Sequence, residues 1–175
     1  MDRQPVYVIL GGSGGIGSAL ARRLAGNGAT VAIAARGAER LAALGRELGG
    51  ARTGALDATS TTEVEAFVRA TAEAEGGVDG IVNCVGSILL KAAHQTSDEE
   101  WRRTLAANLD TAFAAVRAGA RVMGKSGGAI VLMSSAAAEV GLPNHEAIAA
   151  AKAGVAGLAR AAAATYAGKG IRVNA

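Results

Sequence analysis

The 175-residue sequence is poor in aromatic residues, cysteine and proline. Aromatic side chains make up 3% of the chain and apolar residues 50%, so Ala, Val, Leu and Ile must build the core. Cys84 is the only cysteine, which excludes an internal disulfide and suits a reducing compartment. A chain of this length can bury a sizeable core. We therefore expect one domain over residues 1–175.

Long runs of one charge and long uninterrupted apolar runs are also missing. The chain carries 18 Lys and Arg and 15 Asp and Glu, but its arginines are scattered, so we predict no nucleic-acid partner. The N-terminal MDRQP lacks the apolar core of a signal peptide. Lys152 and Arg160 interrupt the alanine-rich stretch 147–167, so we predict no membrane span. A cytoplasmic protein without a metal site is the expectation.

Short apolar runs alternate with longer segments of helical spacing. The runs 6–10, 30–35, 80–85 and 129–134 are β-branched and lack a polar face, which is typical of strands buried on both sides of a parallel sheet. Ser60 with Glu63 and Ser97 with Glu100 fit capping boxes at helix starts. An apolar stripe is expected along one face of the segment 98–123, at Trp101, Leu105, Leu109, Phe113, Val116 and Met123. The alternation predicts an α/β fold with a Rossmann-type, doubly wound parallel sheet in three α/β/α layers.

Five glycines occupy the seven positions 11–17, between the first strand and the first helix. A helix N-terminus attracts phosphate through its unpaired N–H groups, and glycine lets the phosphate come close. Two registers fit: Gly12, Gly14 and Gly17 form G-x-G-x-x-G, whereas Gly11, Gly15 and Gly17 form G-x-x-x-G-x-G. Because the run follows a strand and opens a helix, it predicts a pyrophosphate site; the alternative is a plain glycine-rich turn.

In the second register, Gly11-x-x-x-Gly15-Ile16-Gly17, the chain resembles the short-chain dehydrogenase/reductase family. Asp57 matches the acid that binds adenine in that family, and NCVG (83–86) matches the turn beside the cofactor at Asn83 and Gly86. GIRVNA (170–175) resembles the sixth strand of the family's sheet.

The resemblance also implies site residues, a cofactor and partners. Asn108, Ser135 and Lys152 match the family's relay asparagine, active-site serine and lysine. The implied NAD(P)-binding residues are Gly11, Ser13, Gly15, Ile16, Gly17, Arg36, Asp57, Asn83, Gly86 and Lys152. The implied substrate is a small-molecule alcohol or carbonyl compound. Helices 98–123 and 145–167 would form a homodimer or homotetramer.

The residue after the second strand bears on the choice of nicotinamide cofactor. An acid there would hold the ribose 2′-hydroxyl of NAD, whereas an arginine accommodates the 2′-phosphate of NADP. Ala35 stands at the position of the acid and Arg36 follows it. This favours NADP(H); NAD(H) is the alternative if Arg36 is an ordinary loop residue.

The tyrosine of the family's Tyr-x-x-x-Lys motif is missing. Ile148 lies four residues before Lys152 and thirteen after Ser135, so it occupies the tyrosine position and has no proton to give. His145 lies one turn earlier and exchanges protons near neutral pH, which makes it a candidate acid. The alternative is a surface or capping histidine beside Asn144. Cys84 is interpreted as a buried strand residue, and His94 as exposed.

The sequence ends at Ala175, after the sixth strand, whereas the family continues into a segment that covers the substrate. We therefore expect a fragment of a longer protein. Two functions fit these features. One is an NADP-preferring oxidoreductase with altered acid chemistry, which the retained asparagine, serine and lysine favour. The other is a dinucleotide-binding scaffold or inactive subunit, which Ile148 favours.

Overall fold

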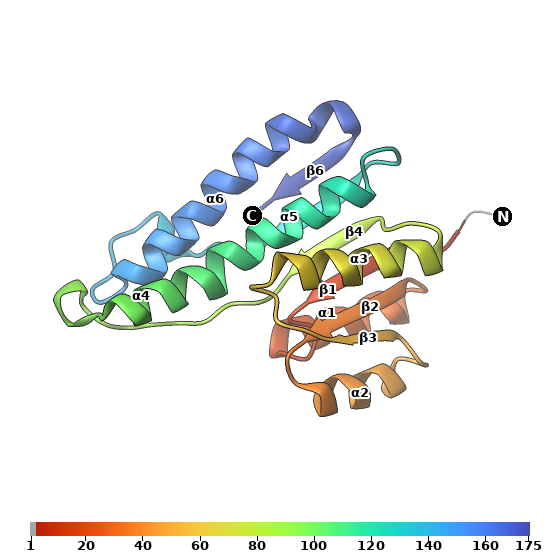
Figure 1. The fold of residues 1–175 in the computed structure, drawn as a ribbon, viewed down its shortest axis with the longest axis horizontal. Coiled ribbons are helices and arrows are strands. Elements are labelled where there is room, and N and C mark those ends of the chain that lie inside the picture. The colour runs from red at the N-terminus through yellow and green to blue at the C-terminus, as the bar shows by residue number, and fades with distance from the viewer. Residues whose placement is uncertain (1–2) are drawn as a thin grey trace.

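A six-stranded parallel sheet forms the centre of the computed structural model, which describes residues 3–175 (Figure 1). The strand order is β3-β2-β1-β4-β5-β6, and every neighbouring pair is parallel. The strands are β1 (Val6–Leu10), β2 (Thr30–Ala35), β3 (Arg52–Ala55), β4 (Gly80–Asn83), β5 (Gly128–Leu132) and β6 (Ile171–Asn174). The order reverses between β1 and β4, which confirms the predicted doubly wound topology.

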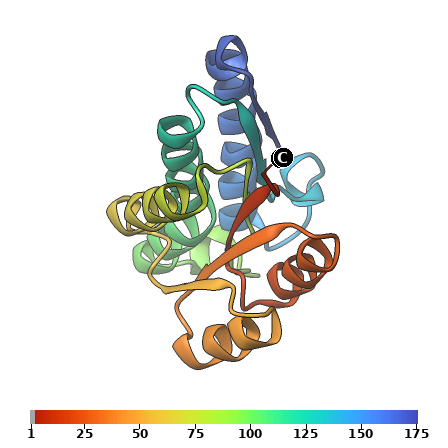
Figure 2. The same cartoon turned by 90° about the vertical axis from the view of Figure 1, so that its right-hand side faces the viewer.

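Helices cover the sheet from both sides (Figures 1 and 2). On one face lie α1 (Gly15–Gly26) and α2 (Ala38–Glu47); on the other lie α3 (Thr61–Glu75), α5 (Thr111–Val122) and α6 (Glu146–Tyr166). The short α4 (Asp98–Leu105) runs into α5 through a π-helical turn, Ala106–Asp110. Single 3-10 turns span Ala93–Gln95, Ala136–Ala138 and Ala167–Lys169.

The strand side chains alternate between two hydrophobic clusters. Val6, Val8 and Leu10 belong to the large cluster under α3, α5 and α6. Ile9 and Ile33 belong to the smaller one under α1 and α2. All five are at most 1% exposed. The period of two along each strand therefore builds both cores from the same residues of the sheet.

The second helical layer covers only half of the sheet. Among the described residues, α1 and α2 pack on β1, β2 and β3, and the same face of β4 to β6 has no helix over it. Val131 of β5 is therefore 37% exposed. The three predicted layers are confirmed over β1 to β3. The prediction that the fifth strand is buried on both sides is wrong.

The expected apolar stripe on segment 98–123 is also wrong in part. Val116 and Met123 are buried, but Trp101 is 40% and Phe113 47% exposed. The π-helical turn Ala106–Asp110 lies between those two aromatic residues, and it holds more residues per turn than an α-helix. It therefore rotates the helix faces on its two sides relative to each other, which sequence spacing does not predict.

One of the two predicted capping boxes forms completely. The Ser97 hydroxyl accepts from the Glu100 amide, and the Glu100 carboxylate accepts from the Ser97 amide. At α3 the Ser60 hydroxyl accepts from the Glu63 amide, but the Glu63 carboxylate accepts instead from the amide of Asp57, at 3.0 Å. The second box is therefore half formed, and Glu63 instead fixes the chain leaving β3.

The segment Glu146–Lys169, which contains α6, is long and apolar enough to cross a membrane by length and composition alone, with an 18-residue window of mean hydropathy 1.3. It carries Lys152 and Arg160, and it packs against β6, the Ala136–Ala138 turn and the π-helical turn. Core helices of globular proteins share this composition. In this fold, 39% of that apolar window is buried against the rest of the chain.

Candidate functional site

The glycine-rich loop leaves the carboxyl end of β1 beside the β1–β4 junction, where open α/β sheets bind ligands. Gly11 has a φ of +76°, and a Cβ there would lie 2.9 Å from the carbonyl carbon of Cys84. A Cβ on Gly17 would collide with the carbonyl oxygen of Gly11. By contrast, a Cβ on Gly15 would meet no atom within 4 Å. The loop thus has two kinds of glycine: some allow close backbone packing, while Gly15 keeps a surface open.

The N-terminus of α1 has the features of an anion site. The helix begins at Gly15, its N-cap Gly14 offers no side-chain hydrogen bond, and its first turn contains no acidic residue. The first N–H groups of a helix have no partner within the helix, so here they are available to a ligand. Ile16, in that first turn, is 65% exposed. This geometry agrees with the register Gly11-x-x-x-Gly15-x-Gly17.

A cavity of about 270 Å³ extends from this loop across the ends of the neighbouring strands. It is lined by Gly11, Ser13, Gly14, Ala35, Arg36, Gly37, Arg40, Leu56, Asp57, Ala58, Thr59, Cys84, Val85, Gly86, Ser87 and Ala107. The fold therefore brings together the predicted residues Ser13, Arg36, Asp57 and Gly86, which are up to 73 positions apart in sequence. Burial raises the pKa of the Cys84 thiol, which keeps it protonated.

Two arginines lie at the end of the cavity formed by β2. Arg36 directly follows the strand, and Arg40 lies in the first turns of α2, its guanidinium beside Gly37. Both side chains are exposed, and neither makes an ion pair within residues 3–175. Sequence reasoning missed Arg40; its i,i+4 spacing from Arg36 was the available signal.

Asp57 lies on the opposite wall, after β3. One carboxylate oxygen accepts hydrogen bonds from the amide and the hydroxyl of Thr59, both at 2.9 Å. These bonds, with a smaller effect from the charge of Arg36, hold the pKa of Asp57 below its usual range. Asp57 is therefore ionised at neutral pH and available as a hydrogen-bond acceptor.

Asn83 fixes the turn that contacts the glycine loop. Its side chain is 2% exposed; Nδ2 donates to the Thr111 hydroxyl at 3.1 Å, and Oδ1 accepts from the Val85 amide at 3.2 Å. This side chain thereby ties the end of β4 to the start of α5.

The second part of the site surrounds Lys152. Its side chain is buried, and Nζ donates to the carbonyl of Met133 at 2.7 Å. The hydroxyl of Ser134 donates to the Lys152 carbonyl at 3.0 Å. Asn108 lies in the π-helical turn, and a Cβ on Gly86 would be 2.9 Å from its Oδ1 and 3.6 Å from the Lys152 Nζ. The structure thus places Asn108 and Lys152 close to Gly86, a residue that lines the cavity. Ser134 was missed as a positioning residue.

Ile148 occupies the position of the missing tyrosine, and Ser135 and His145 are the other predicted residues of this part of the site. Ser135 is exposed, and its hydroxyl accepts from the Ala137 amide at 3.2 Å. Ile148 is 4% exposed, so the tyrosine position is filled with carbon. His145 precedes α6, and its Nδ1 lies 2.7 Å from the carbonyl of Pro143, with no capping bond to the helix. His94, as predicted, is exposed.

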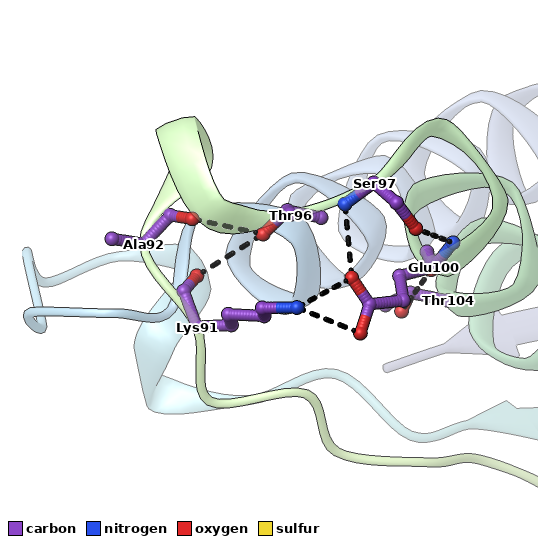
Figure 3. A network of polar contacts seen from close by, with 6 residues as sticks. All are labelled: Lys91, Ala92, Thr96, Ser97, Glu100 and Thr104. Carbon is purple, nitrogen blue, oxygen red and sulfur yellow. Dashed lines mark hydrogen bonds and ion pairs between the residues drawn. The ribbon is translucent and has the colours of Figure 1, made fainter.

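A polar network holds the loop that leads from β4 to α4 (Figure 3). Lys91 Nζ donates to both oxygens of Glu100, at 3.0 and 2.9 Å, inside the capping box of α4. The Lys91 amide donates to the Asn144 carbonyl at 2.8 Å. Because Asn144 directly precedes His145, this network ties the β4–α4 loop to the start of α6.

Replacing Glu100 with Gln is expected to lower the thermal unfolding midpoint by a few degrees at pH 7. Its bonds to Lys91 and Ser97 hold the pKa of Glu100 at about 2, below its value of 4.5 without them. A depressed carboxylate pKa stabilises the fold above the unfolded-state pKa, and this stabilisation is lost as the pH falls toward the folded-state value. The difference between Glu100→Gln and the wild type should therefore shrink below about pH 4.5 in calorimetric scans. Glu99→Gln, at an exposed neighbour, is the matched control; a pH-independent difference would contradict the prediction.

Comparisons with known proteins agree with this fold. A family model described as enoyl-(acyl carrier protein) reductase matches residues 11–175. D-threitol dehydrogenase from Mycolicibacterium smegmatis is 41% identical over 97% of this chain and 67% of its own length. 3beta-hydroxysteroid dehydrogenase from Mediterraneibacter gnavus is 35% identical over 98% of this chain and 64% of its own length. The chain thus spans about two thirds of the length of these curated relatives.

A solved structure gives the same result. The crystal structure of a short chain dehydrogenase from Mycobacterium smegmatis superposes with a TM-score of 0.91, at 34% identity, over 98% of this chain and 75% of that one. Together with the glycine register and the sheet order, these matches establish the relationship. The chain belongs to the short-chain dehydrogenase/reductase family of oxidoreductases.

Proposed function

We propose that this chain binds NADP(H) and serves as the nucleotide-binding and catalytic part of an oxidoreductase acting on a small alcohol or carbonyl compound. The observation that carries the proposal is the cavity that joins the uncapped start of α1 to the two arginines after β2. Members of the family use nicotinamide cofactors. In Rossmann-type folds the pyrophosphate of such a dinucleotide lies at a helix N-terminus. The preference for NADP(H) is our own inference from this chain.

The residues lining the cavity fit such a nucleotide. The open surface at Gly15 and the first N–H groups of α1 would receive the pyrophosphate. Arg36 and Arg40 would bind the 2′-phosphate, since guanidinium groups pair well with phosphate oxygens. Asp57 would accept a hydrogen bond from the adenine amino group. When bound, the nicotinamide supplies or accepts a hydride, while Ser135 would orient the substrate oxygen and Lys152 the ribose.

Alanine substitution of Arg36 or Arg40 is expected to weaken NADPH binding by about tenfold each and to leave NADH binding unchanged. Each arginine faces the cavity without a competing ion pair, and one charged hydrogen bond contributes about 1.5–3 kcal/mol. Arg46→Ala, at an exposed position on the last turn of α2, is the matched control. Calorimetric titration with both nucleotides measures the effect. Equal losses for NADPH and NADH would contradict a 2′-phosphate site.

A second function, a nucleotide-binding scaffold or inactive subunit, is favoured by one observation. The tyrosine position holds the buried Ile148, which exchanges no proton. Both functions require nucleotide binding, but only the oxidoreductase turns over a substrate. An assay that follows NADPH oxidation with a ketone therefore separates them.

We further propose that the chain self-associates through the outer face of α5 and α6. A groove lies there, lined by residues that include Phe113, Leu158 and Tyr166. Phe113 is 47% exposed on this face, which supports burial by a second copy. Sedimentation velocity would then show a dimer or a tetramer.

A further inference from the structure

Ile148 leaves the proposed oxidoreductase without the family's usual acid, and the surroundings of Lys152 suggest what replaces it. We propose that Lys152 itself supplies the proton to the substrate oxygen in this chain. This inference rests on the proposed function, since it concerns the same site. It assigns to the lysine a step that a tyrosine performs in the family.

The first argument is the availability of protons on Lys152. An ammonium group has three N–H donors, and the structure uses one of them, toward the Met133 carbonyl at 2.7 Å. Ile148, one turn earlier on α6, adds no polar atom. Of the two remaining donors, one can bind the ribose as proposed above. The other has no tyrosine hydroxyl to bind and is free for a substrate oxygen.

The second argument is that no countercharge fixes the proton on Lys152. Within residues 3–175 no carboxylate lies within 4.0 Å of its Nζ. The charged side chains on elements packed against α6 are Asp98, Glu99, Glu100, Arg102, Arg103, Asp110, Arg117, Arg121, Lys169 and Arg172. All are exposed except Glu100, which pairs with Lys91. Burial alone therefore acts on Lys152 and lowers its pKa, which makes it a better proton donor near neutral pH.

The third argument is access to the cavity. A Cβ on Gly86 would lie 3.6 Å from the Lys152 Nζ and 2.9 Å from the Asn108 Oδ1, so both groups lie close to Gly86, which lines the cavity. Asn108 Nδ2 donates to the Ser87 hydroxyl at 3.2 Å, so that hydroxyl keeps its own proton free. Ser87 is exposed and lines the cavity. Lys152 Nζ thus lies near the cavity wall formed by Gly86 and Ser87, from which water can return a proton to the amine.

His145 is less well placed for the same task. Its Nδ1 is engaged by the Pro143 carbonyl at 2.7 Å. Seven residues along α6 separate it from Lys152, or about 10 Å at 1.5 Å per residue. The geometry therefore favours the lysine over the histidine.

The proton and electron balance of the step is complete. When the carbonyl carbon accepts a hydride from the reduced nicotinamide, the C=O π pair moves onto the oxygen. That oxygen takes a proton from the Lys152 ammonium, which becomes a neutral amine and is reprotonated by water from the cavity. In the oxidation direction the neutral amine removes the hydroxyl proton.

The first test follows the titration of the four lysines directly. The ¹³Cε resonances of Lys91, Lys125, Lys152 and Lys169 can be recorded against pH and assigned with Lys→Arg variants. The proposal predicts that Lys152 loses its proton at a clearly lower pH than the exposed Lys125. If the two titrate together, the proposal is overturned whatever the activity. This measurement needs neither substrate nor cofactor.

The second test uses NADPH with 2,2,2-trifluoroacetophenone as the ketone. Lys152→Met is expected to lower kcat at least a hundredfold at saturating NADPH, the usual contribution of a general acid, while the matched control Lys125→Met keeps wild-type kcat. In the wild type, kcat should fall above the pH at which Lys152 deprotonates by NMR. The proposal is overturned if kcat is unchanged in Lys152→Met, or if the fall of kcat with pH does not follow that titration. It is also overturned if kcat collapses in His145→Ala alone, or if the wild type shows no turnover. Failure to bind NADPH would instead count against the proposed function.

Discussion

Gly17→Ala is expected to destabilise the fold by about 3 kcal/mol, because its added methyl group would meet only backbone atoms. That Cβ would collide with the Gly11 carbonyl oxygen and lie 2.9 Å from the Cα of Gly12 and 3.0 Å from the carbonyl carbon of Gly11. A backbone cannot rotate away as a side chain can, so the start of α1 must move off the loop. For a chain of this size the unfolding midpoint should fall by roughly 6–12 °C.

Gly15→Ala is the matched control for that variant, and it should behave in the opposite way. Its Cβ meets nothing within 4 Å, and alanine is a better helix former than glycine, so the fold should keep its stability. NADPH affinity should nevertheless fall at least about tenfold, because the methyl group stands where the pyrophosphate must approach the helix. Calorimetric scans and titrations of both variants give the comparison. Wild-type NADPH affinity in Gly15→Ala would show that phosphate does not bind there.

The second large effect is expected at Asn83. Replacing it with Ala removes two hydrogen bonds inside the protein and leaves the Val85 amide without its partner. We expect a loss of about 2 kcal/mol in the free energy of unfolding, the usual cost of an unsatisfied buried polar group. NADPH binding should weaken as well, because the freed turn packs directly against Gly11.

Thr111 allows the Asn83 contact to be isolated. Thr111→Val removes the acceptor of Nδ2, and the double variant completes a thermodynamic cycle. We predict a coupling energy of about 1 kcal/mol from urea unfolding. A coupling near zero would mean that Asn83 acts through Val85 alone.

Most of the fold could be predicted from local patterns. The β-branched runs predicted β1, β2, β4 and β5 and the parallel topology, since each strand needs a helical crossover to reach the next, whereas β6 followed from the family resemblance and no apolar run indicated β3. The glycine loop could also be predicted from local pattern, because a run of glycines between a strand and a helix is typical of a phosphate-binding turn. The predicted strand ends were less accurate. The predicted strands 80–85 and 129–134 each extend two residues past the observed ends of β4 and β5, at Asn83 and Leu132.

The features that sequence missed depend on contacts between distant segments. The π-helical turn around Asn108 changes helix phase and thereby exposes Phe113, which no spacing rule indicates. Arg40 joins the cavity because α2 begins immediately beside Arg36. The exposure of Val131 follows from which helices cover the sheet, a property of the whole assembly. The missing tyrosine could be recognised from the sequence, but the burial of the Lys152 side chain could be recognised only from the structure.

The central claim is that the start of α1 and the two arginines form an NADP(H) site, and calorimetric titration of the chain with NADPH and NADH tests it most directly. The account predicts micromolar binding of NADPH, weaker binding of NADH, and loss of this preference in the Arg36→Ala, Arg40→Ala double variant. Equal affinity for the two nucleotides would contradict the 2′-phosphate site. Binding of neither nucleotide would contradict the nucleotide site itself.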